Sequence, residues 1–128
     1  MPRTTLSVPT IAAPRGHYSH AVIAQGRMLY VAGQVPIDAD GEVVGADAAT
    51  QARQVLANLS AVLDAASATL ADVVKTTVYL TDLGDRAAVG DVRRIYFAGD
   101  PPANTLVVAA GLADPRYLVE IDAIAVLP

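Results

Sequence analysis

Two adjacent segments have contrasting apolar spacings, and together they constrain the fold more than any other feature. Between residues 47 and 66, apolar side chains recur every three or four residues, which is the spacing of one helix face. Residues 72–80 instead alternate apolar and polar side chains, which predicts a β-strand with two different faces. A one-sided helix followed directly by such a strand predicts a helix packed on a sheet.

Shorter patterns supply the remaining elements. A weaker helical spacing predicts a second helix over residues 85–97, with Asp85 as its N-cap, as Asp47 is for the first helix. Gln25-Gly26 separates two short apolar runs, and the simplest interpretation is two strands joined by a tight turn. The other predicted strands are a proline-rich opening segment, residues 104–109 and residues 118–127. The sequence therefore predicts an α+β domain with both helices on one face of the sheet.

Size and composition limit what this domain can do. The 128 residues fit one domain, residues 1–128, and 53% hydrophobic residues make a folded core expected. No apolar run reaches the roughly 18 residues that span a bilayer, and no signal peptide is evident, so no membrane contact is expected. The chain has no cysteine, which removes disulfides and thiolate chemistry and makes the cytoplasm the expected location.

Charge and apolar content also bear on partners. A net charge of −4 lacks the basic excess that phosphate contacts require, so nucleic acid is not an expected partner. A small domain with this apolar excess is expected to bury surface against further copies of itself, as a homo-oligomer.

Few residues are candidates for chemistry on pattern alone. His17 and His20 lie three apart but lack a third ligand, so no metal site is predicted. Arg93-Arg94 is the only paired basic unit and is interpreted as a solvated helix face. Glu120 lies within an apolar strand, where carboxylates are seldom buried unless paired or functional. Facing a cleft, it would be a general acid or base; facing solvent, it would have no such role.

A set of motifs follows in order along the chain between residues 8 and 126. The motifs are Ala13-Pro14, Gly16-His17-Tyr18-Ser19-His20-Ala21, Tyr30-Val31-Ala32-Gly33-Gln34-Val35-Pro36, Gln51 with Asn58-Leu59, Val73-Val74-Lys75-Thr76-Thr77-Val78-Tyr79-Leu80, Pro102-Ala103 and Val119-Glu120-Ile121-Asp122-Ala123-Ile124-Ala125. Together they resemble the Rid family of reactive-intermediate imine deaminases, also called the YjgF/YER057c/UK114 family.

The resemblance implies a chorismate-mutase-like α+β fold, with a six-stranded mixed sheet, two helices on one face, and assembly as a homotrimer with clefts between subunits. It also implies hydrolysis of imines and enamines to a keto acid and ammonia, without metal or organic cofactor. In this pattern Glu120 positions or activates water. The implied substrate-binding residues are Tyr18, Gly33, Asn104 and Thr105, and weaker candidates are Ala32 and Phe97.

One residue departs from the family pattern. An arginine that clamps the substrate carboxylate follows Pro-Ala in deaminase members, whereas Asn104 follows Pro102-Ala103 here. An amide offers weaker hydrogen bonds than a guanidinium, so Asn104 suits a neutral carbonyl or amide better. Alternatively, Arg15 or Arg116 reaches the cleft from a loop and restores the charge, although the favoured interpretation is that both are surface residues.

Three functions remain open at this level. The first is hydrolysis of a small carbon–nitrogen double bond or related acid–base chemistry, with Glu120 handling the proton and standard 2-imino acid deaminase activity in doubt. The second is a non-catalytic trimer that binds a small metabolite or supports a pathway enzyme. The third, ribonuclease or translation inhibition, is disfavoured by the acidic net charge.

Overall fold

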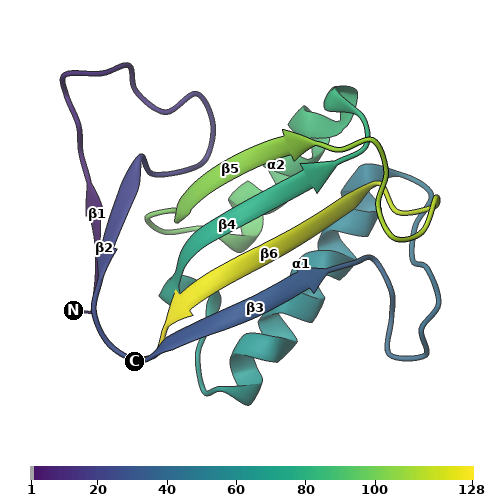
Figure 1. The fold of residues 1–128 in the computed structure, drawn as a ribbon, viewed down its shortest axis with the longest axis horizontal. Helices are drawn as coiled ribbons and strands as arrows, with labels where there is room; N and C mark the ends of the chain where they lie inside the picture. The colour runs from purple at the N-terminus through teal and green to yellow at the C-terminus, as the bar shows by residue number, and fades with distance from the viewer. Residues whose placement is uncertain (1) are drawn as a thin grey trace.

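The computed structural model describes residues 2–128 and contains six strands, two α-helices and two short 3₁₀-helices (Figure 1). In chain order these are β1 (Arg3–Leu6), β2 (Ala21–Ala24), β3 (Met28–Gln34), α1 (Ala48–Ala65), η1 (Leu70–Asp72), β4 (Val73–Leu80), η2 (Leu83–Asp85), α2 (Arg86–Tyr96), β5 (Ala103–Val108) and β6 (Val119–Val126). No helix among these residues is both long and apolar enough to cross a bilayer.

Four strands form a mixed sheet in the order β3-β6-β4-β5, in which β4 and β5 are parallel and the other neighbours antiparallel. Both helices cover the same face of this sheet, and the opposite face is open (Figure 1). The predicted α+β class, with two helices on one face of a mixed sheet, is confirmed.

The remaining two strands differ from prediction. β2 pairs with β1 rather than with β3, and this two-stranded sheet stands beside the four-stranded one (Figure 1). The six strands are thus divided between two sheets, and the interpretation of residues 20–32 as one hairpin was wrong. The reason is burial of the β3 side chains. Because β3 pairs with β6, Val31 lies opposite Ala123 and is buried beneath the helices. Ile23 of β2, outside this sheet, stays 60% exposed.

Helix α1 anchors the core as its pattern predicted. The Asp47 side chain accepts a hydrogen bond from the Thr50 amide at 2.8 Å, so the predicted N-cap is confirmed. The apolar face of α1 is fully buried through Val55, Leu59 and Leu63. Since α1 packs on β3 and β6, it fixes the position of β6, the strand that carries the motif containing Glu120.

Helix α2 begins differently from prediction. Asp85 occupies the N-cap position, but its side chain makes no capping hydrogen bond. The preceding turn η2 runs directly into α2, and Asp82 accepts from the Gly84 amide at 2.7 Å instead. The inward face of α2 buries Val89, Val92 and, unexpectedly, Arg93. This face forms one wall of the candidate site.

Candidate functional site

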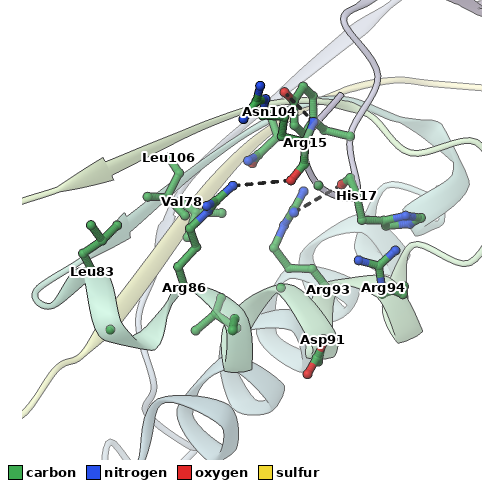
Figure 2. Close-up of a pocket in the computed structure, with 16 residues that line it drawn as sticks. Arg15, His17, Val78, Leu83, Arg86, Asp91, Arg93, Arg94, Asn104 and Leu106 are labelled. Atoms are coloured by element: carbon green, nitrogen blue, oxygen red, sulfur yellow. Dashed lines mark hydrogen bonds between the residues drawn. The ribbon is translucent and has the colours of Figure 1, made fainter. Parts of the chain in front are cut away.

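A cavity of about 700 Å³ lies between α2 and the loop of residues 15–18 (Figure 2). Val78 of β4 and Leu106 of β5 form its apolar floor. Both side chains are on the helix-covered face of the sheet, because Val78 pairs with Leu106 and is fully buried. The cavity is therefore a groove at the β5 edge, beside the helix that covers that edge.

Positive charge is concentrated around this cavity. Four arginines line it, out of nine lysines and arginines in the chain: Arg15, Arg86, Arg93 and Arg94. Asp91 is the only acidic residue in the lining, and Figure 2 shows its carboxylate directed away from the guanidinium groups of Arg86 and Arg93. Within residues 2–128, none of the four arginines forms an ion pair. The cavity of this acidic protein is cationic; we call it the arginine pocket.

Arg93 is the most deeply placed of the four. Its side chain is only 5% exposed, with Nη1 donating to the His17 carbonyl at 3.3 Å and Nη2 to the Thr76 hydroxyl at 3.4 Å. Its Nε is buried and has no hydrogen-bond partner among the residues that the structure describes. Burial, with a smaller contribution from Arg94, lowers the Arg93 pKa to about 10. A buried cation without a counter-charge is costly, so an anion bound beside this guanidinium would be stabilised.

Asn104 belongs to the same cavity. Its Oδ1 accepts a hydrogen bond from Thr76 Oγ1 at 2.7 Å, and the same hydroxyl oxygen accepts from Arg93. Thr76 thus links the buried guanidinium to Asn104, the residue at which the resemblance led us to expect an arginine. Tyr18 also lines the cavity, and its hydroxyl accepts from the Arg15 amide at 3.2 Å.

Glu120 and Gly33 lie together elsewhere, on the open face of the sheet. A Cβ atom built on Gly33 would stand 2.0 Å from Glu120 Oε2, so the carboxylate occupies the space that a side chain at residue 33 would need. Ala32, next to Gly33, is exposed. Only glycine at residue 33 permits the half-buried Glu120 side chain to lie against the backbone of β3.

Asn104 and Glu120 are far apart within one chain. Glu120 aligns with Tyr79 of β4 and hence with Val107 of β5, three residues beyond Asn104 and two strands away. Strand spacing and rise place their backbones about 14 Å apart, and the two side chains point to opposite faces. Thr105, adjacent to Asn104, points to the open face, where its hydroxyl accepts from Lys75 Nζ at 2.6 Å.

The remaining sequence candidates have separate positions. Phe97 is buried, and its ring centroid lies 5.8 Å from Cζ of Arg93, so it supports that guanidinium from the core. Arg15 reaches the cavity, whereas Arg116 does not line it. Arg116 pairs with Asp114 at 2.9 Å and, through hydrogen bonds, lowers the Asp114 pKa to about 2.

The sequence interpretation missed Arg86 and Arg93. The view of Arg93-Arg94 as a solvated face was wrong for Arg93, which follows Val89 by four residues and so falls on the buried face of α2. The four-residue spacing from Val89 is the sequence signal that could have identified Arg93 as an inward-facing residue. No group of three or more histidine or acidic side chains within residues 2–128 could hold a metal ion.

Known proteins resemble this chain over nearly its full length. The family model described as Endoribonuclease L-PSP matches residues 10–127. A RutC family protein of Pyrococcus horikoshii is 46% identical over 88% of each chain, and a 2-iminobutanoate/2-iminopropanoate deaminase of Rattus norvegicus is 38% identical over 97% of this chain and 90% of its own. The solved structure of the conserved Rid-family protein YyfB of Yersinia pestis superposes with a TM-score of 0.92 at 40% identity, covering 99% of this chain and 100% of that one.

These matches confirm the class of protein that the fold and motifs indicate: small α+β domains of the YjgF type. The chain belongs to the Rid (YjgF) family.

Proposed function

We propose that three copies of this chain form clefts in which water adds to the carbon–nitrogen double bond of a small imine, with an enamine reacting as its imine tautomer. In the reaction, the water oxygen bonds to the imine carbon, the carbon–nitrogen bond then breaks, and a carbonyl compound and ammonia leave. Glu120 takes a proton from the attacking water and gives it to the imine nitrogen. It then moves the hydroxyl proton of the resulting carbinolamine to the departing amine, so one carboxylate serves both steps. No cofactor is needed.

The observation that carries this proposal is the contact between Glu120 and Gly33. A carboxylate half-buried on a central strand, packed against backbone with no side chain between, has a fixed position relative to any ligand beside Gly33. General acid–base catalysis requires such fixed geometry more than any other property.

The open sheet face supports a trimer. Tyr30, Met28 and Val107 leave 74%, 36% and 39% of their surface exposed there, and no helix of the same chain covers them. A second copy packed with its β5 edge against this face would bury these side chains, and in that arrangement the Glu120 of one copy would lie near the arginine pocket of the next.

A second candidate function is binding without turnover. It is favoured by the lining of the arginine pocket, which does not include Glu120. If assembly does not unite the two groups, the pocket holds its ligand without a group for proton transfer. Ribonuclease action is disfavoured, since a net charge of −4 opposes RNA binding.

The test compares the disappearance of freshly generated 2-imino acids with and without the purified protein. The sources are a panel of amino acids and an amino-acid oxidase. We expect acceleration that Glu120→Gln abolishes and that Asp122→Asn, on the same strand and face, retains. Light scattering on each sample reports the mass of the assembly. Equal acceleration by Glu120→Gln would eliminate this role for Glu120, and no acceleration by any sample would favour binding.

A further inference from the structure

The arginine pocket has more positive charge than a single carboxylate requires. Counting Arg15, Arg86, Arg93 and Arg94 against Asp91 leaves three unbalanced charges in the lining. The expectation of a neutral ligand was based on Asn104 alone, and it took no account of arginines from helix α2. The ligand class must therefore be inferred from the whole cavity.

Helix α2 carries two of these arginines on the same side. Arg86 and Arg93 are seven residues apart, which places them on the same side of the helix, two turns apart. Arg86 Nη2 donates to the Arg15 carbonyl at 3.5 Å, and Arg93 Nη1 donates to the His17 carbonyl. Figure 2 shows both guanidinium groups directed at this loop.

The spacing of these two groups selects the kind of anion. Residues 15 and 17 are two positions apart, so the carbonyls that the guanidiniums touch are separated by at most about 7 Å. Two carboxylates on a chain of about four carbons can span a distance of this order, so that each carboxylate engages its own guanidinium. Each guanidinium retains N–H groups beyond those used in the loop contacts, and Arg93 Nε has no partner.

We propose that the arginine pocket binds a small dicarboxylate, with Arg93 replacing the guanidinium that the family pattern places at residue 104 and Arg86 binding the second carboxylate. The inference rests on the function proposed above and names its substrate class: a 2-imino dicarboxylic acid, such as the imine formed on oxidation of aspartate. Asn104 then contributes its amide N–H groups beside Arg93, held by Thr76.

The first experiment measures ligand affinity by calorimetry on the assembled full-length protein. The probes are succinate, butyrate and butyramide, which share a four-carbon chain, and inorganic phosphate. We expect succinate to bind at least tenfold more tightly than butyrate or phosphate, and butyramide to bind immeasurably weakly. Butyramide binding as tightly as succinate would overturn the proposal, and so would phosphate binding more tightly than succinate.

Variants then assign the two carboxylates. Arg86→Gln and Arg93→Gln are each expected to weaken succinate binding at least tenfold, whereas Arg27→Gln makes the same change of charge in a turn outside the pocket and retains it. Arg86 is exposed, so its variant tests the pocket even if Arg93→Gln fails to fold. Unchanged succinate affinity in Arg86→Gln overturns the proposal. It is also overturned if Arg93→Gln alters the assembly mass but not the affinity, because the anion on Arg93 would then be a carboxylate of a neighbouring copy.

Turnover separates this inference from the proposed function. Succinate binding that depends on Arg86, without hydrolysis of any imine, would support a dicarboxylate ligand and overturn the proposed hydrolytic function. Hydrolysis of 2-iminobutanoate and 2-iminosuccinate at equal kcat/KM, unaffected by Arg86→Gln, would support the proposed hydrolytic function. It would overturn the proposal that the substrate is a dicarboxylate.

Discussion

The two faces of the four-stranded sheet carry opposite charge near the candidate site. The helix-covered face has the arginine pocket at the β5 edge, whereas the open face has Glu120 and Asp122 on β6, beside Lys75 on β4, the single cation in these four strands. The group suited to moving protons and the groups suited to holding an anion are thus separated by the sheet itself. One subunit therefore carries two unlike half-sites, and under the proposed function a complete site combines half-sites from different copies.

The largest expected effect comes from substitutions that remove one half-site from each of two variants. Glu120→Gln and the double variant Arg86→Gln/Arg93→Gln should each lower imine hydrolysis at least a hundredfold. Refolded together, they should regain activity, because each mixed assembly contains a cleft with an intact carboxylate from one chain and an intact pocket from another. Activity is measured before and after joint refolding, with each variant refolded alone as the control. A mixture as inactive as its components would place both half-sites in one subunit.

Filling the space at Gly33 should damage only one half-site. In Gly33→Val, the added Cβ overlaps Glu120 Oε2 and forces that side chain away, so hydrolysis should fall about a hundredfold while succinate affinity stays unchanged. Gly99→Ala is the matched control, since a Cβ there meets nothing within 4 Å. Equal hydrolysis by Gly33→Val and the unaltered protein would show that the position of Glu120 does not matter.

Gln51 fixes the loop that leads into β6. It is 1% exposed and makes three hydrogen bonds, donating to the Gly45 and Arg116 carbonyls and accepting from the Leu118 amide. Gln51→Leu leaves these backbone groups unsatisfied, so the free energy of unfolding should fall by about 2–3 kcal/mol in denaturant titration. Gln54→Leu, which loses one side-chain bond to Asn58, should lower it by less than about 1 kcal/mol. Equal losses would contradict this account of the loop.

Arg93 should show a conflict between stability and binding. Its charge is buried without a counter-charge and its two hydrogen bonds are long, so Arg93→Met should raise the free energy of unfolding by about 1 kcal/mol. Arg94→Met, at the exposed neighbouring position, should change it by less than about 0.5 kcal/mol. Thermal and denaturant unfolding without added anion provide the measurement. Destabilisation by more than 1 kcal/mol would assign Arg93 a structural role.

The smallest expected effect concerns the open face alone. The Tyr79 hydroxyl donates to Asp122 at 3.1 Å, and this hydrogen bond raises the Tyr79 pKa above its ordinary value of 10.0. The bond therefore contributes to stability below pH 10 and is lost as the pH rises through the folded-state pKa. Asp122→Asn should lower the Tyr79 pKa toward its ordinary value, as followed by phenolate absorbance. An unshifted titration curve would mean that the bond is not formed in solution.

Local patterns in the sequence predicted local structure well. The spacing of residues 47–66, the alternation of residues 72–80 and the N-cap Asp47 all correspond to elements of the structure, because each depends on side chains close together in the chain. Strand pairing depends on distant segments. β3 pairs with β6, about ninety residues later, and nothing in the Gln25-Gly26 turn indicates that partner.

For the candidate site, local motifs nominated residues but not their arrangement in space. Motif positions indicated Glu120, Gly33, Tyr18 and Asn104, but not that the sheet divides them between two faces. Arg93 was missed because a charged residue was interpreted by its type rather than by its place on the helix. In α2 it takes an inward position normally filled by an apolar side chain.

Gly90 lies on the wall of the arginine pocket, in the middle of α2, and a Cβ there would meet no atom within 4 Å. Glycine in a helix costs about 1 kcal/mol relative to alanine, so larger residues at this position would strengthen the helix while narrowing the cavity. Ligand size can therefore change during evolution by single substitutions that leave folding intact. Stability and ligand size are therefore coupled at this residue: keeping glycine keeps the cavity wide at a cost in helix stability, and a larger residue reverses both.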